Sequence, residues 1–184
     1  YKMSPKEYGT IAINGNDLNM FTIKPLDFDE NKEYPLFMYQ YSGPGSQSVA
    51  NRWGNDYWYQ MLAQEGYIIL CVDGRGTGLK GRDFKKVTQL ELGKYEVEDQ
   101  IAVAKKMGEL PYVDEDRIGI WGWSYGGFMS SNCLFQGNDT FSMAIAVAPV
   151  SSWRFYDTIY TERYMQTPQE NPSGYDNNSP ISHV

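Results

Sequence analysis

The fold of this 184-residue chain is decided by the stretch Gly119-Ile120-Trp121-Gly122-Trp123-Ser124-Tyr125-Gly126-Gly127. An apolar run from Arg117 to Trp121 precedes the turn and predicts a β-strand, and a helix-compatible run from Phe128 to Phe135 follows it. Ser124 therefore lies at the centre of the pattern G-x-S-x-G in a strand–turn–helix context. A serine there stands on a strained turn, and glycines two residues before and after it let strand and helix pass closely. We interpret Ser124 as a nucleophile, the alternative being an ordinary strand-to-helix turn.

Strands and helices alternate along the rest of the chain. Residues 8–13 and 18–23 flank Asn14-Gly15 and predict a β-hairpin, because this dipeptide favours a tight turn. Further strands are predicted at 34–41, 67–72 and 141–150, and helices at 57–64, 96–107 and 153–165. A hairpin followed by this alternation predicts an α/β fold, with a mostly parallel sheet and helices on both faces. Functional loops should lie at the carboxyl ends of the strands, after Tyr41, at Ser124 and after Val150.

Composition excludes several functional classes. The net charge is −7 and lysine and arginine are scattered, which argues against nucleic-acid binding. No apolar run is long enough for a membrane span, and the chain does not open with a signal peptide. Cys71 and Cys133 are interpreted as buried apolar residues rather than a disulfide framework. With one histidine and no C-x-x-C pair, we expect neither a metal site nor a cofactor.

The glycine-rich loop Gly74-Arg75-Gly76-Thr77-Gly78 invites comparison with phosphate-binding loops, because it follows a predicted strand. It matches neither fingerprint: no Lys-Ser/Thr follows at the P-loop spacing, and the G-x-G-x-x-G pattern fails at Leu79. We expect a tight loop instead, with Arg75 bonded to neighbouring carbonyl groups or to a carboxylate.

Six blocks of sequence, read together, resemble a known family. In order they are Tyr39-Gln40-Tyr41-Ser42-Gly43-Pro44, Val72-Asp73-Gly74-Arg75-Gly76, Glu96-Val97-Glu98-Asp99-Gln100, Gly122-Trp123-Ser124-Tyr125-Gly126-Gly127, Ala146-Val147-Ala148-Pro149-Val150, and Tyr160-Thr161-Glu162-Arg163-Tyr164-Met165. They are similar to the catalytic domain of the dipeptidyl peptidase IV branch of the prolyl oligopeptidase family of serine peptidases. The resemblance extends from about Tyr8 to Met165 and implies an α/β-hydrolase fold.

The resemblance also assigns catalytic roles. It implies that Ser124 is the nucleophile, that the Tyr41 hydroxyl donates to the oxyanion, and that the backbone N–H of Tyr125 is the second donor. This agrees with the chemistry, because the residue after the nucleophile offers its N–H at the start of a helix. Taken without the resemblance, Tyr41 would be read as a core tyrosine.

A proline-binding pocket is implied at Tyr125, Val150, Trp153, Tyr156 and Tyr160. The last three recur at i, i+3 and i+7 and predict one face of a helix, an arrangement more often used for core packing than for a pocket. Flat, rigid rings suit the compact, apolar pyrrolidine ring. Arg163 and Tyr164 are expected to support this pocket.

The general base and the acid that orients it are not evident. This fold needs an acid and then a histidine after the serine, and the sole histidine, His183, follows a polar stretch with no apolar strand. We therefore expect His183 not to be the base and the acid and histidine to lie beyond Val184. Residues 1–184 then form a partial catalytic domain, without its last strands and without the family's β-propeller, that is inactive alone.

The expected function is that of a serine peptidase releasing X-Pro or X-Ala dipeptides through an acyl-enzyme. Peptides with proline or alanine at the second position would be its substrates. The alternatives are an oligopeptidase or acylaminoacyl peptidase of the same family, or a catalytically silent interaction module. The resemblance further implies an extracytoplasmic location and a homodimeric parent protein.

Overall fold

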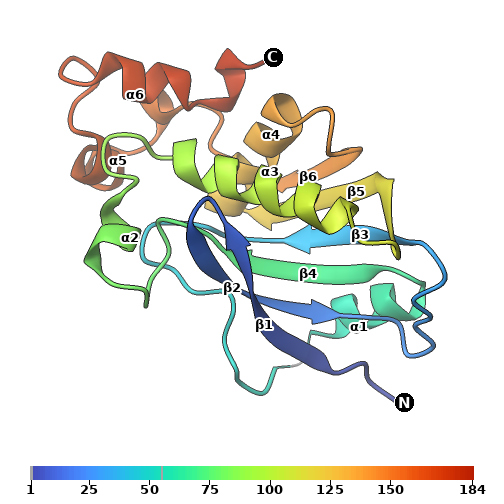
Figure 1. Cartoon of the computed structure of the whole chain (residues 1–184). Coiled ribbons are helices and arrows are strands. Elements are labelled where there is room, and N and C mark those ends of the chain that lie inside the picture. The colour runs from blue at the N-terminus through green and yellow to red at the C-terminus, as the bar shows by residue number, and fades with distance from the viewer. Residues whose placement is uncertain (1, 55) are drawn as a thin grey trace.

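A mixed β-sheet forms the centre of the computed structural model, which describes residues 2–54 and 56–184 (Figure 1). The strands are β1 (Lys6–Ile13), β2 (Asn16–Ile23), β3 (Tyr34–Tyr39), β4 (Ile68–Asp73), β5 (Val113–Trp123) and β6 (Met143–Val147). Their order across the sheet is β1-β2-β4-β3-β5-β6. The hairpin strand β2 pairs antiparallel with β4, whereas β3, β4, β5 and β6 run parallel. The α/β fold expected from the sequence is confirmed.

Helices cover both faces of this sheet. They are α1 (Tyr57–Gln64), α2 (Arg82–Lys86), α3 (Lys94–Gly108), α4 (Tyr125–Gln136), α5 (Thr158–Met165) and α6 (Pro172–Asn177), with short 3₁₀ turns η1 (Trp153–Phe155) and η2 (Pro180–Ser182). Helix α1 packs on β2 and β4 from one side, while α3 and α4 lie together on the other side (Figure 1). Helices α5 and α6 lie beyond the end of the sheet, near the carboxyl ends of the parallel strands.

Strand β4 shows why the core divides into two layers. All six of its residues are buried, as expected for a strand covered on both faces. Ile68, Leu70 and Val72 point into the larger core under α3 and α4. Ile69 and Cys71 point into the smaller core under α1. This alternation follows from the two-residue period of a strand, and it confirms that Cys71 behaves as a buried apolar residue.

The hairpin formed as predicted. Its turn residues Asn14 and Gly15 both have positive φ, 49° and 75°, the conformation that a two-residue turn requires. Ile11 pairs with Leu18 and Ile13 with Asn16 in the antiparallel register.

The last third of the chain departs from the prediction. The strand predicted at 141–150 is limited to β6, and the helix predicted at 153–165 is divided into η1 and α5. The division occurs because Tyr156 is extended and the Asp157 side chain caps α5 by accepting from the Tyr160 amide at 2.8 Å.

Two short helices were not predicted. Helix α2 has five residues and is too short for a periodic pattern. Helix α6 did carry a local signal in the sequence, because Asn171 and Pro172 are residue types that often begin a helix. In the structure the Asn171 side chain accepts from the Gly174 amide, and Pro172 occupies the first turn.

Candidate active site

Ser124 occupies a strained turn between β5 and α4. Its φ of 59° and ψ of −113° lie in a region that residues with a side chain rarely adopt. The Ser124 amide donates to the Val147 carbonyl at 2.9 Å, and its carbonyl accepts from the Phe128 amide at 3.0 Å. Such strain costs about 1–3 kcal/mol and persists only where the surrounding structure holds it. The turn therefore places the half-buried Ser124 at the start of a helix.

The glycines of the motif allow three backbone segments to meet under this turn. A Cβ at Gly122 would lie 2.5 Å from the Gln40 carbonyl oxygen and 2.6 Å from the Cα of Gly126. One at Gly126 would lie 2.6 Å from the same Gln40 oxygen, and one at Gly127 would lie 2.7 Å from the Val147 oxygen. Each obstacle is backbone and cannot swing aside, so the motif requires side-chain-free residues here.

We expect Gly122→Ala to destabilise the protein by about 3 kcal/mol or more, because the new methyl group overlaps backbone on two sides. Gly9→Ala is the matched control, since nothing lies within 4 Å of a Cβ there and the residue sits in an exposed strand. It should leave stability unchanged or raise it slightly. Denaturant unfolding of both variants measures the difference, and equal midpoints would contradict this account of the turn.

The two residues expected to donate to the oxyanion, Tyr41 and Tyr125, lie near each other in the fold. The amide of Tyr125 belongs to the first turn of α4, where amides have no carbonyl partner within the helix. Tyr41 lies just beyond β3, which pairs with β5 through Tyr39 and Trp121. The Tyr41 ring centroid is 6.1 Å from that of Tyr125. Burial, together with two neighbouring phenols, raises the pKa of Tyr41, so its hydroxyl stays protonated and able to donate.

A buried side chain that sequence reasoning missed connects these donors. The Gln40 amide nitrogen donates to the Gly126 carbonyl at 2.8 Å and to the Ser130 hydroxyl at 3.2 Å, both on α4. Its oxygen accepts from the Ser42 hydroxyl at 3.1 Å. Gln40 is fully buried, so breaking these bonds would leave unpaired polar groups. The network fixes the strand end that carries Tyr41 against the helix that carries the Tyr125 amide.

The aromatic residues expected to form a pocket do gather, although they do not share a helix. Trp153 lies in η1, Tyr156 in the extended link and Tyr160 in α5, so the single helical face predicted from their spacing is wrong. The Trp153 ring stacks on Tyr160 at 6.2 Å and lies 5.7 Å from Tyr125. Tyr156 meets Tyr160 edge to face at 5.4 Å. The structure therefore joins these rings to the residue that follows Ser124, with Val150 half-buried nearby.

Exposure differs across this group. Trp153 is 1% exposed and packs into the core, whereas Tyr156 is 43% exposed and Tyr160 is half-buried. The Tyr160 pKa is raised by burial and by neighbouring phenols, among which is that of Tyr41. Tyr160 thus lies near Tyr41 as well as Trp153. Trp153 forms the base of the group and Tyr156 its rim.

A second missed residue, Glu96, holds the Tyr125 ring. The Tyr125 hydroxyl donates to one Glu96 oxygen at 2.6 Å, and the Gly93 amide donates to the other at 3.1 Å. Glu96 is 1% exposed, and burial raises its pKa to about 7. The sequence predicts Glu96 near the start of a helix but does not indicate that its carboxylate points inward, toward Tyr125, the residue after Ser124.

The raised pKa of Glu96 predicts a pH-dependent stability. The unfolded carboxyl titrates near 4.5 and the folded one near 7, so its favourable contribution is complete below pH 4.5 and is lost as pH rises through 7. The free energy of unfolding should fall by about 3 kcal/mol over this window. Glu96→Gln should remove most of that fall, whereas Glu109→Gln, on an exposed residue, should not. Denaturant melts at pH 5 and pH 8 test this, and a wild-type protein equally stable at both values would refute it.

Two further sequence predictions meet different outcomes. Arg75 is bonded to the Asp99 carboxylate, with its terminal nitrogen 2.7 Å from one oxygen, which confirms the bonded loop expected at 74–78. His183 bonds through Nε2 to the Asn177 carbonyl oxygen at 2.8 Å, so this nitrogen donates. That arrangement supports the expectation that His183 is not the base, which stays a prediction.

Within residues 2–54 and 56–184, no group of three or more His, Cys, Asp or Glu side chains is arranged to hold a metal ion. Each helix over the same residues is too short or too polar to cross a bilayer.

Comparison with known proteins agrees with this geometry. A family model described as the prolyl oligopeptidase family matches residues 53–184. A protein of Podospora anserina named "probable dipeptidyl-aminopeptidase B" is 52% identical over 177 residues, which cover 96% of this chain and 19% of that protein. A Phaeosphaeria nodorum protein of the same name is 50% identical over 174 residues, 94% of this chain and 19% of the relative.

A solved structure gives the same result. The crystal structure of Porphyromonas gingivalis dipeptidyl peptidase 4 superimposes with a TM-score of 0.97 at 52% identity, covering 100% of this chain and 26% of that one. The chain therefore spans about a fifth of the length of these curated relatives and about a quarter of the solved protein. The family model covers well over half of the chain. With the strained serine turn and the matching fold, this establishes that the chain belongs to the prolyl oligopeptidase family.

Proposed function

We propose that the whole protein is a serine peptidase that releases X-Pro or X-Ala dipeptides from the N-termini of peptides. The observation that carries this proposal is the attachment of an aromatic group to the strained nucleophile turn: Trp153 contacts the ring of Tyr125, the residue after Ser124. A nucleophile turn alone would support any acyl transfer. A rigid aromatic group beside it favours an acyl residue with a compact apolar side chain.

The chemistry follows from the positions of three groups. The Ser124 oxygen attacks the carbonyl carbon of the scissile bond, and its proton passes to a base that the family resemblance assigns to a histidine after Val184. The carbonyl oxygen becomes negative and accepts from the Tyr41 hydroxyl and the Tyr125 amide. The start of helix α4 adds a favourable dipole at the same point. When the C–N bond breaks, the proton goes to the leaving amine, and water later releases the dipeptide from Ser124.

The aromatic group supports selection of proline. A pyrrolidine ring has no N–H once it is part of a peptide bond, so a site without hydrogen-bonding demands suits it. Trp153 and Tyr160 stack with an angle of 23° between their planes, and Tyr156 stands almost perpendicular to Tyr160. Alanine fits the same space with less contact.

Product analysis of the full-length protein tests this function. Incubated with a peptide beginning Ala-Pro and with the same peptide carrying an acetylated N-terminus, the enzyme should release Ala-Pro from the first and leave the second intact. Mass spectrometry identifies the products. Internal cleavage after proline would assign the oligopeptidase alternative, and removal of the acetylated first residue would assign an acylaminoacyl peptidase. Loss of neither peptide would favour a catalytically silent module.

We also propose, from the family resemblance, that the whole protein acts outside the cytoplasm and as a homodimer. Cell fractionation and the molar mass of the purified protein in solution test these two points.

A further inference from the structure

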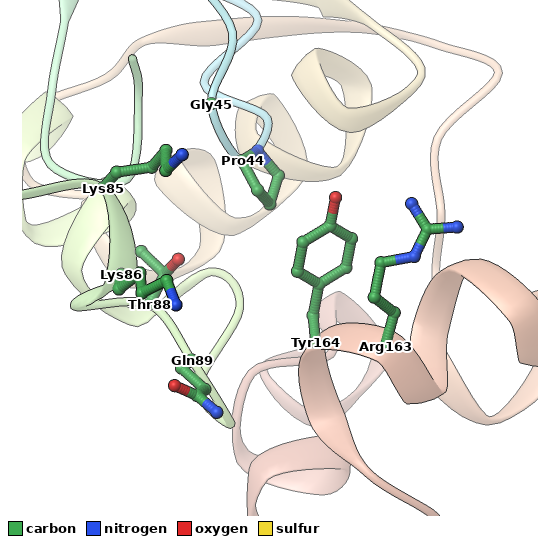
Figure 2. Close-up of a pocket in the computed structure, with 8 residues that line it drawn as sticks. All are labelled: Pro44, Gly45, Lys85, Lys86, Thr88, Gln89, Arg163 and Tyr164. Atoms are coloured by element: carbon green, nitrogen blue, oxygen red, sulfur yellow. The ribbon is translucent and has the colours of Figure 1, made fainter. Parts of the chain in front are cut away.

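A cavity of 310 Å³ lies beside the aromatic group and has no part in the mechanism above. It opens between α2, α5 and the loop that follows β3 (Figure 2). The residues that line it are Pro44, Gly45, Lys85, Lys86, Thr88, Gln89, Arg163 and Tyr164. Pro44 follows Tyr41 by three residues, and the Tyr164 ring packs edge to face on Tyr160 at 5.1 Å. The cavity therefore adjoins the proposed peptide site on the side of Tyr41 and Tyr160.

The charge of this cavity is opposite to that of the chain. Three of its lining residues, Lys85, Lys86 and Arg163, are cations, and none is acidic, although the chain carries a net charge of −7. Some cations elsewhere in the fold are paired; Arg154, for example, bonds to Asp176 at 2.6 Å. In the described part of the chain, no carboxylate lies within 4.0 Å of the side-chain nitrogens of the three cavity cations.

The walls combine this charge with an apolar surface. Figure 2 shows the Tyr164 ring directed toward Pro44, with the Arg163 side chain beside it and the Lys85 amine extending toward the Pro44–Gly45 loop. The Arg163 guanidinium lies 5.9 Å from the centre of the Tyr164 ring. A ligand with a short apolar stem and a negative end matches this combination, which describes the side chains of Asp and Glu.

We propose that this cavity is a subsite for a carboxylate of the bound peptide, an inference that rests on the proposed function. The free N-terminus of a substrate is an ammonium group, which these cations repel, so it does not enter the cavity. The carboxylate has two sources: the residue before the proline, or a residue after the scissile bond. Both present the same chemistry, and the experiment separates them.

The expected selectivity is moderate and salt-dependent. Lys85, Lys86 and Arg163 are exposed, and exposed ion pairs contribute little individually. Two or three such pairs correspond to a preference of roughly threefold to thirtyfold for Glu over Gln at low ionic strength. Salt at about 0.5 M should remove most of that preference, because the charges are screened.

Four peptides test the proposal on the full-length enzyme. One pair begins Glu-Pro and Gln-Pro with neutral residues following; the other begins Ala-Pro-Glu and Ala-Pro-Gln. The ratio of kcat/KM within each pair is measured at low and high salt. A Glu preference in the first pair assigns the carboxylate to the residue before proline, and one in the second pair assigns it to the leaving peptide. Equal rates within both pairs overturn the proposal.

Lysine variants attribute the preference to the cavity. Lys85→Gln with Lys86→Gln should bring the Glu/Gln ratio to about one. The control is Lys105→Gln with Lys106→Gln, which makes the same change of net charge on α3, away from the cavity, and should keep the ratio. Lys85→Glu with Lys86→Glu should reverse it, so that Gln is preferred over Glu. An equal loss of preference in the cavity and control variants would leave only a general effect of net charge and overturn the proposal.

A binding measurement separates this inference from the proposed function. Fluorescence anisotropy of the same peptides on the Ser124→Ala protein needs no turnover. If no peptide is cleaved but the Glu peptides bind more tightly and lose that advantage in the Lys85/Lys86 variant, the peptidase proposal fails and the carboxylate site stands. If the peptides are cleaved and bind without any Glu advantage, the carboxylate site fails alone.

Discussion

Replacing Ser124 by alanine in the full-length enzyme is expected to lower kcat by about 10⁴–10⁶-fold while peptide affinity changes little. The side chain removed is the proposed attacking group, and the alanine methyl fits a turn that a serine already occupies at φ 59°. Stability should not fall, since the Ser124 contacts recorded in the fold are made by its backbone amide and carbonyl. Steady-state hydrolysis of an Ala-Pro anilide measures the effect.

Ser131 gives a matched control for this prediction. It lies on the same helix, α4, and its hydroxyl donates to the Gly127 carbonyl at 3.1 Å. Ser131→Ala removes one oxygen from the same element and should keep kcat within a few-fold of wild type. Comparable rates for the two variants would mean that Ser124 is not the nucleophile and that its strained turn serves packing alone.

Tyr41→Phe is expected to lower kcat by roughly 10²–10³-fold with KM nearly unchanged, the pattern of a contact made mainly in the transition state. The hydroxyl is a neutral donor over the physiological range, because burial raises its pKa. The ring itself should stay in place, since its centroid lies 6.1 Å from that of Tyr125 and it packs closely over Gly43, where a Cβ would come within 2.4 Å of it.

Tyr39→Phe removes a phenol oxygen two residues earlier in the chain and serves as the control. Tyr39 packs with the smaller core under α1, and its ring contacts Tyr59 and Trp121. Its kcat should stay near that of wild type. A near-normal kcat for Tyr41→Phe would mean that Tyr41 serves only in packing. The Tyr125 amide would then be the remaining candidate for the oxyanion donor.

Local patterns were sufficient for much of the fold. The Asn14-Gly15 turn, helix α1 at Tyr57–Gln64 and the buried strand β4 were predicted close to their observed bounds, since each depends on periodicity or turn residues within a short segment. The Ser124 turn belongs to the same class, because its glycines and flanking elements lie within about ten residues. The family resemblance then indicated which residues should lie around Ser124, namely Tyr41, Tyr125 and the aromatic group after Val150.

Local patterns failed where capping or chain-distant contacts decided the structure. The helix predicted at 153–165 is interrupted because Asp157 caps the start of α5. The helical spacing of the aromatic residues gave no indication of this interruption. In the sequence, Gln40 is a single polar residue at the end of a predicted strand. The fold brings its side chain to the carbonyl of Gly126 in α4, 86 residues later in the chain. Glu96 and Tyr125 are likewise 29 residues apart.

The sequence by itself thus determined the order of the strands and main helices, the turn at Ser124 and the family. Only the tertiary structure decided which buried polar groups hold that turn, how the aromatic rings meet, and where scattered cations form one cavity. Lys85 and Arg163 lie 78 residues apart in the sequence, on two different helices, α2 and α5. The physical reason is that backbone conformation responds to neighbouring residues, whereas burial, pairing and charge concentration depend on which distant segments the sheet brings together.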